Sequence, residues 1–262
     1  MTSSAEIKGC CAAVYSSEAV HWLLGDVLHP GGEELTQRLA RALEVGPGEL
    51  VVDVGSGLGK SALTIARATG CAVVGVDLSP ANVGRAAARA TAAGLAGRVR
   101  FLQGDAEALP LPDASVDGAL SECSLCLVPD KRAAVREVAR VLRPGARVAI
   151  SDVTASPAEL PPELRTLSAW TACLADARPL AELAELLEES GLVVEQLEGH
   201  DELLRTLVDR VENRLRFASL LGEQLPAGLG DGIAGGLLLV SAARRALDAG
   251  VVGYGAVYAR GP

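Results

Sequence analysis

One segment constrains the fold of this 262-residue chain more than any other. Four of the five residues in 50–54 are apolar, and glycines follow at alternate positions: Gly55, Gly57 and Gly59. A helical pattern begins directly afterwards, at Lys60. A strand that turns through glycines into a helix lets the backbone approach a ligand closely, above the N-terminus of that helix. This order predicts an α/β fold with a ligand at the carboxyl end of a parallel sheet.

A carboxylate at the end of the next strand indicates the kind of ligand. Residues 72–76 are predicted to form that strand, and Asp77 follows. A carboxylate there can accept hydrogen bonds from both hydroxyls of a ribose. The glycine spacing is G-x-G-x-G, whereas dinucleotide-binding loops have G-x-G-x-x-G. The acidic Asp53 before it suits the ammonium of an amino-acid group. The pattern therefore favours S-adenosylmethionine (SAM) over NAD.

The segments that follow resemble the class I SAM-dependent methyltransferases. A third predicted strand, residues 98–103, leads into a turn that is similar to the adenine-binding turn of that family: Gly104-Asp105-Ala106-Glu107-Ala108-Leu109-Pro110. Strands are also predicted over 117–121 and 147–152, with the family-like turn Arg143-Pro144-Gly145 before the second. The resemblance covers about residues 48–153. It implies a Rossmann-like fold with a seven-stranded, mostly parallel sheet flanked by helices, and SAM as cofactor.

The resemblance also implies a set of cofactor-binding residues. Asp53 is expected to orient the methionine end, Asp77 to hold the ribose, and Asp105 with Ala106 to meet the adenine. The full set is Asp53, Gly55, Ser56, Gly57, Gly59, Asp77, Leu78, Gly104, Asp105, Ala106, Glu107 and Glu122. Glu122 is alternatively a base for an oxygen acceptor or a polar group near the mouth of the site.

The remaining segments extend this core on both sides. Residues 1–47 are expected to form an arm and helix over the active site, 48–155 the SAM-binding core, and 156–262 a helical cap with the last strands of the sheet. Apolar periodicity predicts helices over 33–43, 132–142, 159–177, 180–190, 203–221 and 233–249. The last two strands are predicted over 192–197 and 251–259.

Composition limits the partners. The net charge is −9 without a long run of Lys or Arg, which argues against nucleic acid or an anionic membrane as partner. The N-terminus lacks the apolar segment of a signal peptide, and no apolar run approaches the length of a membrane span. The chain is therefore expected to be cytoplasmic, with its six cysteines as reduced thiols. Its number of subunits is left open.

Five of the cysteines fall in segments that border the expected active site: Cys10 and Cys11 in the arm, Cys123 and Cys126 after the fourth strand, and Cys173 in the cap. Thiols from three separate segments are the pattern expected for a soft, thiophilic centre. The plainer alternative is that they are buried core residues, as expected for Cys71. A lone C-x-x-C pair is weak evidence for a zinc site.

Two of these segments are similar to the arsenite methyltransferase family. Residues 121–131 resemble its cysteine followed by Leu-x-Pro-Asp-Lys, and 173–177 resemble its Cys-[Ile/Leu]-x-x-Ala segment, whose cysteine binds trivalent arsenic. This chain lacks two further cysteines of the family, one after the glycine loop and one in the C-terminal half. The N-terminal pair could substitute, with Cys126 as a further donor. The resemblance thus implies a metalloid ligand set drawn from Cys10, Cys11, Cys123, Cys126 and Cys173.

Three functions remain open at this point. The favoured one is methyl transfer to a soft nucleophile, above all trivalent arsenic supplied as arsenite, with a thiol reductant as a possible co-reactant. The second is methyl transfer to a small organic acceptor through a thiol, carbon or oxygen nucleophile. The third is a thiol-based metal-binding protein that retains SAM. An oxygen nucleophile would need a base, whereas the lone pair of trivalent arsenic would not. His21, His29 and His200 are expected to be surface or capping residues.

Overall fold

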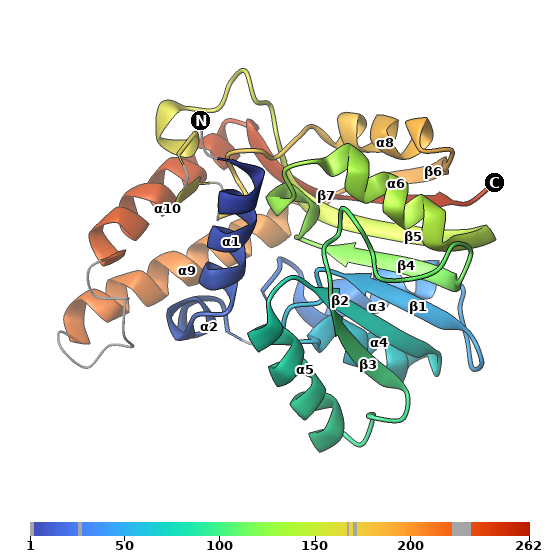
Figure 1. Cartoon of the computed structure of the whole chain (residues 1–262). Coiled ribbons are helices and arrows are strands. Elements are labelled where there is room, and N and C mark those ends of the chain that lie inside the picture. The colour runs from blue at the N-terminus through green and yellow to red at the C-terminus, as the bar shows by residue number, and fades with distance from the viewer. Residues whose placement is uncertain (1–2, 26–27, 167, 170–171, 222–231) are drawn as a thin grey trace.

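The structure is a computed structural model that describes residues 3–25, 28–166, 168–169, 172–221 and 232–262. Seven strands form one sheet in the order β3-β2-β1-β4-β5-β7-β6 (Figure 1). Strand β7 is antiparallel to both of its neighbours, and the pairings from β3 through β5 are all parallel. The expected seven-stranded, mostly parallel sheet is confirmed.

Each predicted strand appears in the sheet. The strands are β1 (Leu50–Val54), β2 (Ala72–Asp77), β3 (Val99–Gln103), β4 (Val116–Glu122), β5 (Leu142–Ala155), β6 (Val193–Gly199) and β7 (Val252–Arg260). Parallel pairing of β1 with β2 and β4 aligns their carboxyl ends. Asp53, Asp77 and Glu122 therefore meet at one edge of the sheet, close to where the chain leaves it.

Helices cover both faces of the sheet. One face carries α3 (Gly32–Ala42), α4 (Lys60–Thr69), α5 (Pro80–Ala92) and α10 (Ile233–Asp248), and the other carries α6 (Lys131–Val141) and α8 (Leu180–Glu189). Successive side chains of a strand alternate between the two faces of the sheet. Val51 therefore packs in the core beneath α3, α4, α5 and α10, and Val52 packs in the core beneath α6 and α8. Both are fully buried, which explains why β1 is apolar at every position except Asp53.

Two short helices, α1 (Ser4–Tyr15) and α2 (Glu18–Leu24), precede this core. Ser3 and Glu6 form a capping box that satisfies two backbone N–H groups at the start of α1. In Figure 1, α1 lies between the sheet and the pair formed by α10 and α9 (Asp201–Leu221), which pack together. Within the described ranges, no helix is both long and apolar enough to span a membrane.

The structure corrects two local expectations. The single helix expected over 159–177 is wrong in the described part: Pro162–Leu164 is one 3-10 turn (η2), and Cys173 has a φ of +63°, which an α-helix does not accommodate. Pro161 and Pro162 explain the break, because each restricts the residue before it. The turn at Arg143–Gly145 lies inside β5 as a bulge, since Val116 pairs with Leu142 but Gly118 pairs with Arg147.

Candidate active site

The glycine loop is fixed by contacts to both neighbouring strands. The N–H groups of Gly55 and Ser56 donate to the carbonyl of Val76, at 2.8 and 3.0 Å. Gly55 has a φ of +73°, and a Cβ there would lie 2.4 Å from the Cβ of Ser124. Glycine is therefore required for both backbone conformation and space, and the loop can pass close to the end of β4.

A cavity opens beside this loop at the carboxyl edge of the sheet. It is lined by ten of the twelve residues expected to bind the cofactor: Asp53, Gly55, Ser56, Gly57, Asp77, Leu78, Gly104, Asp105, Ala106 and Glu122. Gly59 does not line it and acts as a packing position, because a Cβ there would lie 2.5 Å from the Phe101 ring. Glu107 also lies outside the lining and contacts it through Lys8.

The cavity walls contain buried polar atoms that have no partner within the described protein. They are Asp53 Oδ2, Ser56 Oγ and Asn82 Oδ1, and all three residues line the cavity. Burial, reinforced by the charges of Glu122 and Asp77, raises the pKa of Asp53 to about 8. Buried polar groups are normally paired, so these atoms fit a bound polar group such as the ammonium of an amino acid. The residues present therefore suit the methionine end of SAM.

Asp77 and Asp105 are already oriented by hydrogen bonds. Asp77 Oδ2 accepts from the Gly57 N–H at 2.8 Å, and its Oδ1 accepts from the Ser79 N–H at 2.9 Å. Asp105 Oδ2 pairs with Lys8 Nζ at 2.7 Å. A carboxylate oxygen accepts more than one hydrogen bond, so both side chains keep acceptor capacity for a nucleoside.

Three of the five candidate thiols converge. The Sγ atoms of Cys123, Cys126 and Cys173 all lie within 4.8 Å of one another, and the Cys123 thiol donates to Cys173 Sγ at 3.7 Å. Hydrogen bonds from Cys123 and Cys126 lower the pKa of Cys173 well below its usual value. Cys123 and Cys173 have φ values of +51° and +63°, rare for non-glycine residues and typical of functional sites. We call these three residues the thiol cluster.

The cysteines differ in how closely they approach the cavity. Cys11 lines the cavity and is buried, whereas Cys10 is only half-buried and does not line it. Cys71 is fully buried in the core, as expected. Within the thiol cluster, Cys123 lines the cavity, and Cys126 lies behind it, held by donation from its N–H to Asp152 Oδ2 at 2.8 Å.

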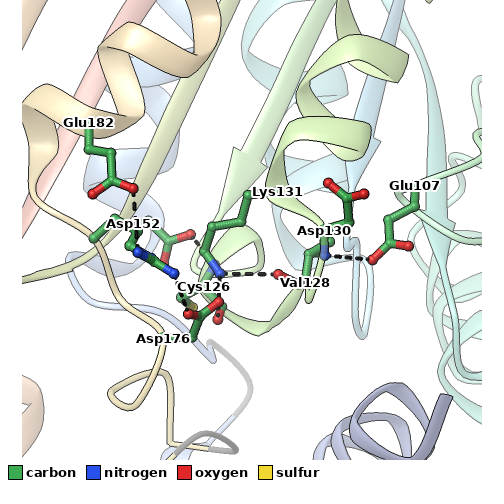
Figure 2. A network of polar contacts seen from close by, with 9 residues as sticks. Glu107, Cys126, Val128, Asp130, Lys131, Asp152, Asp176 and Glu182 are labelled. Atoms are coloured by element: carbon green, nitrogen blue, oxygen red, sulfur yellow. Dashed lines mark hydrogen bonds and ion pairs between the residues drawn. The ribbon is translucent and has the colours of Figure 1, made fainter. Parts of the chain in front are cut away.

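A buried ion pair connects the two segments that carry the thiol cluster (Figure 2). Lys131 Nζ pairs with Asp176 and also donates to the carbonyls of Val128, at 3.1 Å, and Cys126, at 3.4 Å. The Lys131 and Asp176 side chains are only 10% and 14% exposed. Arg178 donates to the second oxygen of Asp176 at 2.9 Å. These contacts fix the segment of Cys173 against the turn that carries Cys126.

The expectation that the histidines are surface or capping residues is wrong for His29, which is buried; His200 is also buried but directly precedes α9. His29 lines the cavity, and its Nδ1 lies 3.0 Å from the Pro30 carbonyl and 3.5 Å from Glu122 Oε1. Glu122 is itself buried, not at the mouth, and accepts a hydrogen bond from Thr36 Oγ1 at 2.9 Å. Donation from Nδ1 to Pro30 leaves Nε2 of His29 as its basic nitrogen.

Sequence reasoning missed several lining residues, chiefly Lys8, Tyr15, Leu28, His29 and Asn82. One signal was present: Lys8, Cys11, Ala12 and Tyr15 recur at the i, i+3, i+4, i+7 spacing of a single helix face. The others come from a loop and a second helix, and no local pattern indicates that they reach the cavity.

Comparisons with known proteins agree with this geometry. Residues 52–150 match the family described as "Methyltransferase domain". The O-methyltransferase resE of Aspergillus sclerotiorum is 34% identical over 197 residues, covering 74% of this chain and 74% of resE. The arsenite methyltransferase of Halobacterium salinarum is 35% identical over 166 residues, covering 62% of this chain and 42% of that protein.

A solved structure supports the fold over the whole chain. The [4+2]-cyclase SpnF superposes with a TM-score of 0.81 at 24% identity, covering 99% of this chain and 97% of SpnF. At that identity the likeness shows the fold alone. The chain spans about half the length of several other curated methyltransferases that it matches. With the family shown by resE and a cavity suited to SAM, the chain belongs to the class I SAM-dependent methyltransferases.

Proposed function

We propose that this methyltransferase transfers its methyl group to a trivalent metalloid, most of all arsenite, held by the thiol cluster. The observation that carries the proposal is the convergence of three Sγ atoms within 4.8 Å beside the cofactor cavity. Cys123 belongs both to the cluster and to the cavity lining, so an atom bound by the cluster has one side toward the cofactor. Soft thiolate ligands select soft centres.

The chemistry is consistent with this acceptor. Each thiol that binds arsenite replaces one hydroxyl, and its proton leaves with that hydroxyl as water. Cys173, with its lowered pKa, is the natural first ligand. Trivalent arsenic keeps a lone pair, so no base has to remove a proton before methyl transfer. SAM supplies a methyl carbon that already bears a good leaving group, and the protein contributes alignment and exclusion of water.

The relatives give partial support. One matched relative is an arsenite methyltransferase, although this chain covers only 42% of it. The cysteine set differs from that expected from the family, because Cys126 supplies the third sulfur of the cluster. Cys11, which also lines the cavity, stands as a further ligand.

The test is turnover with matched cysteine variants. Purified protein is incubated with SAM, arsenite and a thiol reductant, and methylated arsenic is measured together with S-adenosylhomocysteine (SAH). Cys173→Ser is expected to lose more than about 100-fold in rate, beyond what the loss of an outer partner costs. Cys71→Ser is the control, because Cys71 directly precedes β2 at its amino end and does not line the cavity. Bound cofactor without any methylated arsenic would refute the metalloid acceptor.

A second candidate is a small acceptor with a hydroxyl group. It is favoured by His29, which lines the cavity beside Glu122 and whose Nε2, 3.5 Å from Ser61 Oγ, can act as a base. The relative resE is an O-methyltransferase. This reading predicts SAH formation with phenols or other hydroxyl compounds that falls at least tenfold in His29→Gln and survives Cys173→Ser. The opposite response of the two variants would favour the metalloid.

A further inference from the structure

One face of α1 extends along the cavity from its cofactor end to its thiol end. Lys8, Cys11, Ala12 and Tyr15 all line the cavity, at positions i, i+3, i+4 and i+7 of the helix. The cysteine of this face is already among the candidate ligands. Lys8 and Tyr15, at its two ends, have no role in the proposed function.

At the cofactor end, Lys8 closes on two carboxylates. Its Nζ lies 2.7 Å from Asp105 Oδ2 and 2.5 Å from Glu107 Oε2, and its side chain is 19% exposed. Asp105 lines the cavity where the adenine is expected. Glu107 also accepts the N–H of Asp130 at 2.9 Å, at the start of α6 (Figure 2). Lys8 therefore joins α1 to the cofactor loop and, through Glu107, to the acceptor side.

At the other end, Tyr15 covers Cys173 of the thiol cluster. Its hydroxyl lies 3.2 Å from Cys173 Sγ, and burial raises the pKa of Tyr15 well above its usual value, so the phenol stays protonated. Tyr15 lines the cavity whereas Cys173 does not, so the phenol lies between them. A reagent or acceptor that enters through the cavity therefore meets Tyr15 and Cys123, the two lining residues in contact with Cys173, before it reaches Cys173.

The rest of α1 is weakly held. Only Ile7 and Cys11 are buried on this helix, and at its C-terminal end Arg85 Nη1 donates to the Ser16 carbonyl at 2.7 Å. A helix with few buried apolar contacts has a low free energy of local opening. The contacts of Lys8 and Tyr15 thus supply much of what keeps α1 in place.

We propose that Lys8 and Tyr15 are positioning residues through which α1 couples the two sites: closure of Lys8 on Asp105 and Glu107 beside bound cofactor holds Tyr15 over Cys173. Cofactor binding and access to the thiol cluster are then linked, because one rigid helix carries both contacts. The inference goes beyond the metalloid proposal, since it needs only the cofactor and the cysteine thiols.

The experiment measures the alkylation rate of Cys173 by iodoacetamide, followed by peptide mass spectrometry, with and without saturating SAH. In the wild type, SAH is expected to slow alkylation about tenfold, within the usual range of coupling between two sites. In Lys8→Met the protection should fall below about threefold, although SAH is still saturating. Tyr15→Ala should make Cys173 react fast in both states. Arg132→Met, which removes a cation from an exposed ion pair with Glu189, is the control.

The outcomes separate this inference from the proposed function. Thermal unfolding and SAH titration first establish that each variant is folded and binds the cofactor. Equal protection in Lys8→Met and the wild type would overturn the coupling, as would an equal loss in Arg132→Met. Protection that depends on Lys8, in a protein that forms no methylated arsenic, would keep the inference and discard the metalloid acceptor.

Discussion

The unpaired carboxyl of Asp53 predicts that cofactor binding releases a proton. Asp53 is fully enclosed, and burial raises its pKa to about 8 in the cofactor-free protein. At pH 7, roughly nine-tenths of the molecules therefore carry a protonated Asp53. An ammonium placed against Asp53 Oδ2 favours the ionised carboxylate and lowers its pKa. Binding of SAH at pH 7 should release about 0.9 proton per site.

The same linkage fixes the direction and size of the pH dependence. Affinity for SAH should rise with pH, because the competent ionised form becomes more common as the pH approaches 8. From pH 6 to pH 7 its population rises about ninefold, which corresponds to about 1.3 kcal/mol of binding free energy. The isosteric Asp53→Asn variant cannot titrate at this position, so its affinity should change little over that interval.

The assay is isothermal titration calorimetry of SAH binding in buffers of different ionisation enthalpy, at pH 6 and pH 7. The slope of the apparent enthalpy against the buffer enthalpy gives the number of protons released. A wild-type slope near zero at pH 7 would refute the placement of the ammonium against Asp53. A pH dependence that persists unchanged in Asp53→Asn would assign the proton to another group.

Three further predictions concern stability. Gly55→Ala places a Cβ 2.4 Å from that of Ser124 at a φ of +73°, and it should lower the free energy of unfolding by about 1–3 kcal/mol and abolish SAH binding. Adding Ser124→Gly should recover part of the lost stability, measured by thermal unfolding. Tyr254→Phe leaves the buried Ser151 hydroxyl without its 2.9 Å partner and should cost about 1–2 kcal/mol, while SAH titration should show unchanged affinity. Lys131→Met leaves Arg178 as the main cation beside Asp176, and it should lower the free energy of unfolding in urea by about 2 kcal/mol. Adding Asp176→Asn should recover part of that loss. A single variant as stable as the wild type would contradict the role of this pair.

Most of the fold was predictable from the sequence because the central strands of the sheet are buried on both faces. Residues 50–54 and 72–76 are mostly apolar, and glycines lie close to each run in the sequence, so the type and order of these strands are readily predicted. The helix expected over 159–177 failed because apolar periodicity carries no information on backbone dihedrals such as the positive φ of Cys173. Periodicity favours a helix wherever apolar residues recur, even across Pro161 and Pro162.

Some residues of the site could also be predicted from the sequence, and others could not. Residues that follow a strand directly, such as Asp53 and Asp77, were predictable because parallel strands end at one edge. The thiol cluster was predictable only as a larger set, since its choice of members depends on a short 3-10 turn (η1, Leu125–Leu127) that sets Cys126 behind Cys123. An arm over the active site was expected, but the contacts of Lys8 and Tyr15 were not predictable, because their partners are about 100 and 158 residues away in the sequence.

The buried pair of Lys131 and Asp176 has a consequence for protein engineering. Its two charges belong to separate motifs, one at the start of α6 and one just after Cys173. Suppose that the segment around residues 173–177 is replaced by that of a relative without a carboxylate at position 176. Lys131 would then be left without its carboxylate partner in a largely dry environment, and the chimera would be unstable whatever its new specificity. The two motifs therefore form one module for recombination, although 45 residues separate the charges that join them.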